Sequence, residues 1–391
     1  MSGNSSPSIT LRPFRLTDAP DMMLWAGDDQ VTRTLRWKTL TSIEEALTFI
    51  EEVCIPHPWR RSICIDDRSI GFVSIFQGSG EDGRKVDIGY AIAAKYWGQG
   101  IATKAVKIAL PRVFDDLPHV VRLQAFVYVD NLASQRVLEK IGFMKEGLLR
   151  KYAYIKGNVR DLLVYKVVSL HFVKDSSAKK SQAGEYFIPN NKTTTLSASF
   201  GSTPMFLHHH NLAKMSGNSS PSITLRPFRL TDAPDMMLWA GDDQVTRTLR
   251  WKTLTSIEEA LTFIEEVCIP HPWRRSICID DRSIGFMSIF QGSGEDGRKA
   301  EIGYAIAAKY WGQGIATKAV KIALPRVFDD LPDVARLQAF VYVDNLASQR
   351  VLEKIGFMKE GLLRKYAYIK GNIRDLLVYS ILSTDAVPGT S

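Results

Sequence analysis

The spacing of apolar residues along the chain predicts strands and helices in a mixed order. The stretch from Ile88 to Ala93 is apolar, rich in small residues and ends at Lys-Tyr-Trp, which indicates a buried strand. After a glycine-containing turn, apolar residues fall at helical spacing from Lys104 to about Phe114. The same criteria predict further strands at 8–16, 59–65, 69–76, 123–128, 145–154 and 159–165, and helices near 18–26, 42–53 and 134–141. This order predicts an α/β fold with a mixed central β-sheet flanked by helices.

The whole pattern occurs twice in the 391 residues. Residues 1–165 and 215–379 differ only at Val73/Met287, Val86/Ala300, Asp87/Glu301, His119/Asp333, Val121/Ala335 and Val159/Ile373. A period this long indicates a duplicated domain rather than a stacked solenoid. We therefore expect one domain at 8–168 and a second at 222–384.

The segment between the copies, 169–221, is biased toward Ser, Thr, Lys and Asn and has no apolar period. This composition is typical of an unstructured linker. Two interpretations remain open at this point. The chain is either a tandem protein with a flexible tether or two neighbouring genes joined with non-coding sequence read as protein.

Charge and cysteine content narrow the class of protein. The formal net charge is +8, part of it in the linker, and no dense basic face interleaved with aromatic residues is evident, so no nucleic-acid partner is expected. The four cysteines, Cys54, Cys64, Cys268 and Cys278, form no metal-ligand spacing, and free thiols fit a reducing compartment. No apolar run is long enough to span a membrane. We expect a cytoplasmic protein, with the nucleus as an alternative, and no metal.

The turn between the strand at 88–93 and the following helix carries the strongest chemical signal. Glycines at Gly98 and Gly100 allow the chain to turn sharply before the helix begins. The first backbone N–H groups of a helix have no partner within it, and the positive end of the helix dipole lies at the same place. The turn is therefore a candidate anion site.

These residues resemble the acyl-CoA-binding motif of the GCN5-related N-acetyltransferases, Gln/Arg-x-x-Gly-x-Gly/Ala. Gly100 and Ala102 match it, whereas Trp97 replaces the leading Gln/Arg. This replacement resembles the branch that contains the ribosomal-protein N-terminal acetyltransferases. The run from Asn131 through Ser134 to Gly-Phe143 is similar to the second family signature, Asn-x-x-Ser/Ala followed by Gly-Phe. The resemblance implies a sheet that splays between its fourth and fifth strands, with acetyl-CoA in the opening.

The resemblance also implies which residues contact acetyl-CoA. The amides of the turn would hold the diphosphate, the strand edge at 90–92 would bind the pantetheine arm, and Asn131 would donate to and accept from that arm. An alternative for Asn131 is a helix N-terminal residue with a local bond. Trp97 and Tyr96 are expected to pack in the core or in the pocket wall rather than to stack on adenine. The expected cofactor-binding residues are Tyr90, Ala91, Ile92, Gly98, Gln99, Gly100, Ile101, Ala102, Thr103 and Asn131, with Tyr304, Ala305, Ile306, Gly312, Gln313, Gly314, Ile315, Ala316, Thr317 and Asn345 in the second copy.

Acetyl transfer to an amine needs a base for the amine and a proton donor for the departing thiolate. Asp87 and its counterpart Glu301 are the candidate bases; the alternative is a solvated carboxylate at a strand end. The resemblance implies a tyrosine as proton donor four residues after the serine, but this chain has Leu138 and Leu352 at those positions. Ser134 and Ser348 are then the candidate acids, and the alternative for them is an ordinary serine early in a helix.

The sequence therefore predicts an acetyl-CoA-dependent N-acetyltransferase that acts by direct transfer in a ternary complex. The resemblance favours a protein N-terminus or a lysine as the amine. Small amines such as polyamines or amino sugars are an alternative acceptor class. The missing tyrosine leaves open a second class of protein, an acyl-CoA-binding sensor without turnover. A nucleotide-binding P-loop is excluded because no Gly-Lys-Ser/Thr follows the glycines.

Overall fold

The computed structural model describes residues 8–77, 83–167 and 222–385. The first copy contains β1 (Ile9–Arg12), α1 (Ala19–Ala26), α2 (Asp29–Thr32), α3 (Ile43–Phe49), β2 (Arg60–Ile65), β3 (Arg68–Gln77), β4 (Lys85–Ile92), α4 (Ile101–Asp116), β5 (Arg122–Tyr128), α5 (Leu132–Lys140), β6 (Met144–Ile155) and β7 (Asn158–Val167). The second copy contains β8 (Ile223–Arg226), α7 (Ala233–Ala240), α8 (Asp243–Thr246), α9 (Ile257–Phe263), β9 (Arg274–Ile279), β10 (Arg282–Gln291), β11 (Lys299–Ile306), α10 (Ile315–Asp330), β12 (Arg336–Tyr342), α11 (Leu346–Ile355), β13 (Met358–Ile369) and β14 (Asn372–Leu382).

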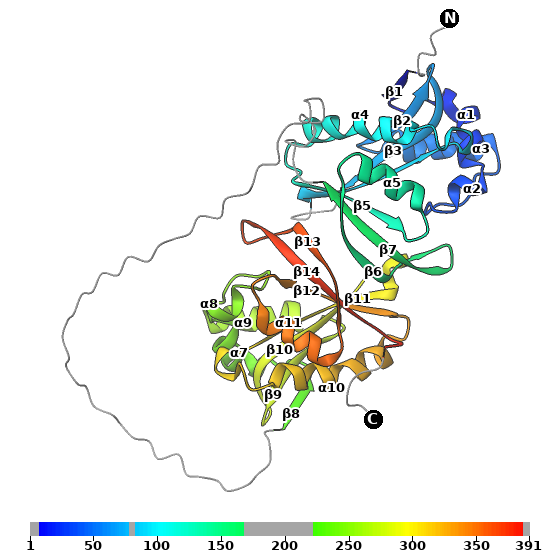
Figure 1. Ribbon diagram of the computed structural model, residues 1–391. Helices are drawn as coiled ribbons and strands as arrows, with labels where there is room; N and C mark the ends of the chain where they lie inside the picture. The colour runs from blue at the N-terminus through cyan, green and yellow to red at the C-terminus, as the bar shows by residue number, and fades with distance from the viewer. Residues whose placement is uncertain (1–7, 78–82, 168–221, 386–391) are drawn as a thin grey trace, which may run out of the picture.

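Each copy is a mixed sheet covered by helices on both faces (Figure 1). Helix α4 buries Ala105, Val106 and Leu110 in one core with Val73 and Ile75 of β3. On the other face, α1 and α3 pack in a second core around Phe72 of the same strand. The two cores separate in this way because successive residues of a strand point to opposite faces.

Strands β4 and β5 are the parallel pair of the first copy, and they separate soon after they meet. Their register has three pairs, Lys85↔Arg122, Val86↔Leu123 and Asp87↔Gln124. β4 then continues to Ile92 while β5 continues to Tyr128, with no further pairing between them in the described residues. The edge of β4 beyond Asp87 is therefore available to a ligand. β11 and β12 repeat the arrangement in the second copy.

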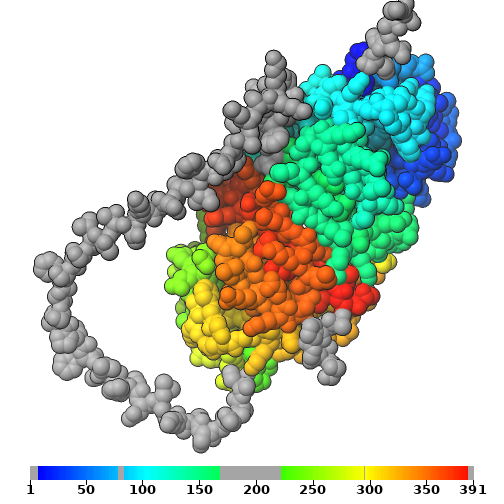
Figure 2. Space-filling view, in the orientation of Figure 1, coloured from blue at the N-terminus to red at the C-terminus, as the bar shows by residue number. Residues whose placement is uncertain are grey.

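The two copies join edge to edge into a 14-stranded sheet with the order β1-β2-β3-β4-β5-β7-β6-β13-β14-β12-β11-β10-β9-β8. At the junction, Gly147 of β6 is paired with Gly361 of β13. A Cβ atom on Gly147 would lie 2.5 Å from the carbonyl oxygen of Glu360, so the backbones approach this closely only because both residues are glycine. The surfaces of the two halves are in contact beside these strands (Figure 2).

Buried side chains reinforce this junction on both sides. Leu149 and Val164 of the first copy form one apolar cluster with Leu363 and Val378 of the second. The Arg122 guanidinium forms an ion pair of 2.7 Å with Glu146, and both side chains are completely buried. Ion pairs also cross the junction. Arg150 Nε lies 3.1 Å from Glu360 Oε1, and Arg364 Nε lies 3.4 Å from Glu146 Oε1.

The elements expected from the sequence are confirmed, with differences at their ends, and the short helix α2 is an addition that was not predicted. The strand expected at 8–16 is a strand only over Ile9–Arg12, because Pro13 has no N–H to continue the pairing. Helix α4 begins at Ile101, three residues before the expected start, because Gly100 adopts the left-handed conformation (φ 74°) and acts as the N-cap. The helix expected at 42–53 is an α-helix to Phe49 followed by a π-helical turn, Ile50–Cys54. The linker expected at 169–221 lies outside the described residues, and the domain boundaries stay a prediction. None of the described helices combines the length and apolarity needed to cross a bilayer.

Candidate functional site

The turn before α4 forms a cup of unpaired backbone amides. Gly98 and Gly100 have φ angles of 75° and 74°, values that glycine adopts without strain. Within the described residues, no acceptor bonds the amides from Gly98 to Thr103. The first hydrogen bond of the helix runs from Lys104 N to Gly100 O, at 3.0 Å. Several N–H donors and the positive end of α4 therefore converge on one place.

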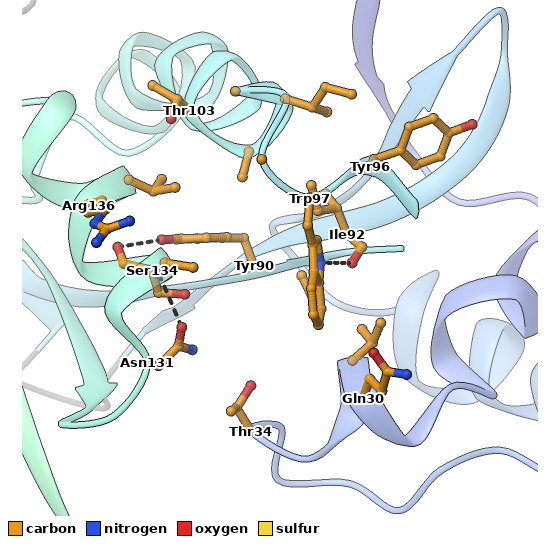
Figure 3. Close-up of a pocket in the computed structure, with 18 of the residues that line it drawn as sticks. Gln30, Thr34, Tyr90, Ile92, Tyr96, Trp97, Thr103, Asn131, Ser134 and Arg136 are labelled. Carbon is orange, nitrogen blue, oxygen red and sulfur yellow. Dashed lines mark hydrogen bonds between the residues drawn. The ribbon is translucent and has the colours of Figure 1, made fainter. Parts of the chain in front are cut away.

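A cleft of about 340 Å³ extends from this cup along the open edge of β4 to α5 (Figure 3). The expected cofactor-binding residues line it, with the exception of Gln99, whose side chain donates to the carbonyl oxygen of Lys95. Trp97 forms part of its wall, and the indole Nε1 donates to Ile92 O at 3.0 Å. The second copy has an equivalent cleft of about 360 Å³.

Three residues on β4 and at the start of α5 are linked by hydrogen bonds at the inner end of the cleft (Figure 3). Asn131 is the N-cap of α5, and its Oδ1 accepts from Ser134 N at 3.1 Å. The Asn131 side-chain amide N–H₂ remains available to a ligand, whereas the oxygen is already used. The Tyr90 hydroxyl donates to Ser134 O at 3.2 Å. Burial raises the pKa of Tyr90, so this hydroxyl stays protonated and can act as a donor.

A second cavity, about 510 Å³ in volume, lies on the other side of these residues. Its walls include Asp87, Arg60 and Trp37. It shares four residues with the first cleft: Thr34, Tyr90, Asn131 and Ser134. In the second copy, where Glu301 stands at the position of Asp87, the matching cavity measures about 240 Å³. It shares the four equivalent residues with its cleft: Thr248, Tyr304, Asn345 and Ser348. In each copy two cavities therefore meet at the same four positions.

Asp87 lies inside the second cavity, within β4 rather than at its exposed end. Gln124 Nε2 on β5 donates to its Oδ1 at 2.7 Å. Burial raises the pKa of Asp87, opposed by the hydrogen bond from Gln124 and by the positive charges of Lys85, Arg122 and Arg36. A carboxylate with a raised pKa is a better proton acceptor near neutral pH than an ordinary aspartate. Sequence reasoning missed Gln124, which reaches Asp87 only through the short parallel pairing of β4 and β5.

A tyrosine from each copy packs against charged residues of the other copy. The Tyr366 ring lies 4.0 Å from Lys85 Nζ and 5.4 Å from the Arg122 guanidinium carbon. Reciprocally, Tyr152 lies 4.1 Å from Lys299 Nζ and 5.6 Å from the guanidinium carbon of Arg336. Cations over aromatic faces are attracted by the ring quadrupole. The tyrosines therefore hold the cations that flank the candidate bases. The sequence offered Tyr152 only as a weaker candidate for the acid, and it did not predict these contacts between the copies.

The cysteines lie apart from both cavities and are buried. Desolvation raises the pKa of the Cys54 and Cys64 thiols, which disfavours the nucleophilic thiolate. Among the described residues, no group of three or more His, Cys, Asp or Glu side chains is arranged to hold a metal ion.

A family model for the acetyltransferase (GNAT) domain matches residues 8–144 and again 222–358. The chain belongs to the GNAT acetyltransferase family. It is therefore an acyltransferase that uses acetyl-CoA as its co-substrate, and both GNAT domains have the mixed α/β fold of the family. The resemblance seen in the motifs and the fold class expected from the sequence are confirmed.

Similar proteins come from bacteria. The uncharacterized N-acetyltransferase YoaA of Bacillus subtilis is 34% identical over 169 residues, which are 41% of this chain and 93% of YoaA. The putative ribosomal N-acetyltransferase YdaF of Bacillus subtilis is 31% identical over 172 residues, 42% of this chain and 92% of YdaF. Among solved structures, Mycobacterium smegmatis RimJ in complex with CoA-disulfide is 29% identical, with a TM-score of 0.35, over 41% of this chain and 82% of RimJ.

Proposed function

We propose that each GNAT domain transfers the acetyl group of acetyl-CoA directly to a primary amine of a protein, an N-terminus or a lysine, in a ternary complex. The observation that carries the proposal is the cup of unpaired amides at the mouth of a cleft that meets a second cavity containing a half-buried carboxylate. The likeness to YdaF over most of its length supports a protein amine as the acceptor.

In this proposal acetyl-CoA occupies the cleft between β4 and α5. The amides from Gly98 to Thr103 would bind the diphosphate, since N–H groups at a helix N-terminus suit anions. The backbone of Tyr90 to Ile92 would bind the amides of the pantetheine arm, and Asn131 would contribute its side-chain N–H₂. The thioester would then lie beside Tyr90, Asn131 and Ser134, where the two cavities meet.

The acceptor amine enters through the second cavity. Asp87, or Glu301 in the second copy, takes a proton from the ammonium group, directly or through a water molecule. The neutral nitrogen attacks the thioester carbonyl carbon, a C–N bond forms, and the C–S bond breaks to release the CoA thiolate. Ser134, or Ser348 in the second copy, gives the thiolate a proton and takes one from the attacking nitrogen, which loses its second proton as the amide forms. The Tyr90 hydroxyl, whose proton is donated to Ser134 O at 3.2 Å, holds this part of α5 against β4 beside the thioester.

Two alternatives keep the same cleft. Small amines would fit the second cavity, whose 510 Å³ lies within the range of small-molecule sites. A sensor that binds acetyl-CoA without turnover would need only the cleft. Asp87, with its raised pKa inside the second cavity, favours the enzyme, because binding of acetyl-CoA alone does not use this group.

The test is a thiol-release assay with the purified full chain, acetyl-CoA and a panel of peptides, polyamines and amino sugars. We expect CoA release that rises with a peptide amine and falls in the Asp87→Ala, Glu301→Ala double variant. Tight binding of acetyl-CoA without amine-dependent release would support the sensor instead. Faster release with a polyamine or an amino sugar than with any peptide would favour the small-amine alternative.

A further inference from the structure

Arg60 in β2 is a buried cation in the wall of the acceptor cavity. Arg60 is only 5% exposed to solvent. The guanidinium Nε donates to Ser74 Oγ at 2.6 Å, and Nη1 donates to Cys54 Sγ at 3.7 Å. Four aromatic rings surround the guanidinium carbon at 5.5 to 5.9 Å, those of Trp37, Phe49, Phe72 and Phe76.

This cation has no counter-ion in the described residues. No carboxylate forms an ion pair with Arg60 there, and no acceptor bonds its Nη2. Burial of a charge without a partner is unfavourable, and the attraction of the aromatic rings offsets only part of that cost. The N–H groups of Nη2 therefore remain as strong unused donors beside the cavity that Arg60 lines.

The second copy repeats the arrangement. Arg274 is 5% exposed, its Nε donates to Ser288 Oγ at 2.6 Å, and it lines the acceptor cavity together with Glu301. It too has no carboxylate within ion-pair distance in the part of the chain that the structure describes. The same unpaired cation thus stands in both acceptor cavities.

The strand register places Arg60 and Asp87 on the same face of the sheet. Arg60 is opposite Ser74, Ser74 is opposite Gly89, and Asp87 is two residues before Gly89 on β4. Residues directly opposite in antiparallel strands, and residues two apart in one strand, project from one face. Gly89 has no side chain, and a Cβ atom built on it would lie 3.3 Å from the Phe76 ring, so this ring borders the space between the cation and the carboxylate. At Gly303 in the second copy, no atom lies within 4 Å of the corresponding position. Two strand spacings and two residues along β4 separate the Arg60 and Asp87 backbones by about 12 Å.

We propose that the acceptor is an amine that carries a carboxylate group within about 12 Å, and that Arg60 and Arg274 bind this carboxylate while Asp87 and Glu301 face the amine. The inference rests on the proposed acetyl transfer and specifies its substrate class. The carboxylate can belong to an acidic side chain near a peptide N-terminus or to a free amino acid. Arginine recognises a carboxylate through charge-assisted hydrogen bonds.

The experiment compares matched acceptors on the unmodified full chain. One arm uses short peptides with Glu or Gln at the first, second or third position, and the other uses free amino acids against their amides. Hydrogen bonds to a charged group are worth about 1.5–3 kcal/mol, so the carboxylate form should have a kcat/KM about 10- to 100-fold higher than its neutral partner in at least one arm. The arm in which the preference occurs identifies the source of the carboxylate.

The Arg60→Met, Arg274→Met double variant should reduce this preference to less than about 3-fold, because the neutral acceptor never used the guanidinium. Arg61→Met with Arg275→Met is the matched control. Arg61 follows Arg60 on β2 and stacks on Trp59 at 5.0 Å, outside the acceptor cavity, so the control loses the same charge and should keep the preference.

Equal rates for acidic and neutral acceptors in the unmodified protein would overturn the proposal, whether or not the variants fold. A preference that survives in the Arg60→Met, Arg274→Met variant would overturn it as well. These results differ from failure of the proposed function, in which no amine of either kind raises thiol release.

Discussion

The amide cup can be tested by adding one methyl group to it. Gly100 has a φ of 74°, and a Cβ atom built on it meets no atom within 4 Å. In the proposed complex this empty space holds the diphosphate of acetyl-CoA. Alanine at this position would therefore be tolerated by the protein but would push the diphosphate away from the amides.

The magnitude follows from two separate costs. A residue with a side chain in the left-handed conformation loses about 1–2 kcal/mol, so the free energy of unfolding should fall by that amount. Loss of a single charge-assisted hydrogen bond costs about 1.5–3 kcal/mol of binding, which corresponds to a Kd for acetyl-CoA about 10- to 100-fold higher. Gly157 supplies the control, because it has a φ of 80°, meets no atom within 4 Å and lies in the turn between β6 and β7.

Both copies must be changed, so the comparison is Gly100→Ala, Gly314→Ala against Gly157→Ala, Gly371→Ala. Chemical denaturation should give similar losses of stability for the two double variants. Calorimetric titration with acetyl-CoA should show weaker binding only for the first. Equal affinity of the two double variants for acetyl-CoA would refute the assignment of the cup.

Three further predictions concern the base and the junction between copies. In a Glu301→Gln background, Asp87→Asn should lower kcat/KM about 100-fold or more. It should also abolish the acid limb of the pH profile of kcat/KM, which lies above the usual aspartate range because burial raises the Asp87 pKa. An intact acid limb would exclude Asp87 as the base. In the same background, Tyr366→Leu should move the acid limb to still higher pH, because Lys85 would be held less firmly beside Asp87. Tyr366→Phe keeps the ring and should leave the acid limb in place. Identical pH profiles for the two variants would contradict the role of the Tyr366 ring in holding Lys85. Gly147→Ala should lower the free energy of unfolding by about 1–3 kcal/mol, because the added Cβ would lie 2.5 Å from a carbonyl oxygen of the other copy. Unchanged stability in chemical denaturation would argue against the pairing of β6 with β13.

Local features of the sequence predicted the elements and the cup well. The apolar periods of β4 and α4 are properties of single segments, and the conformations of Gly98 and Gly100 follow from the freedom of glycine. The local bond foreseen as an alternative for Asn131 is present, since an Asn before a helix commonly accepts from the backbone two or three residues later.

Contacts between distant segments could not be predicted in the same way. The hydrogen bond from Gln124 to Asp87 depends on the register of β4 and β5, which no periodicity specifies. The position of Tyr366 over Lys85 depends on the pairing of β6 with β13, two edges from different copies. The sequence around Arg60 does not distinguish it from an exposed charged residue of a strand. Its burial depends on the packing of four aromatic rings around the guanidinium group.

The most direct test of the account measures amide hydrogen exchange at the two cups with and without CoA. The amides of 98–103 and 312–317 have no acceptor within the described residues, so they should exchange rapidly in the free protein. Saturating CoA should slow exchange in both segments, while the turn around Gly157 stays unchanged. Binding of CoA, shown by calorimetry on the same sample, without any slowing at 98–103 or 312–317 would contradict the central claim.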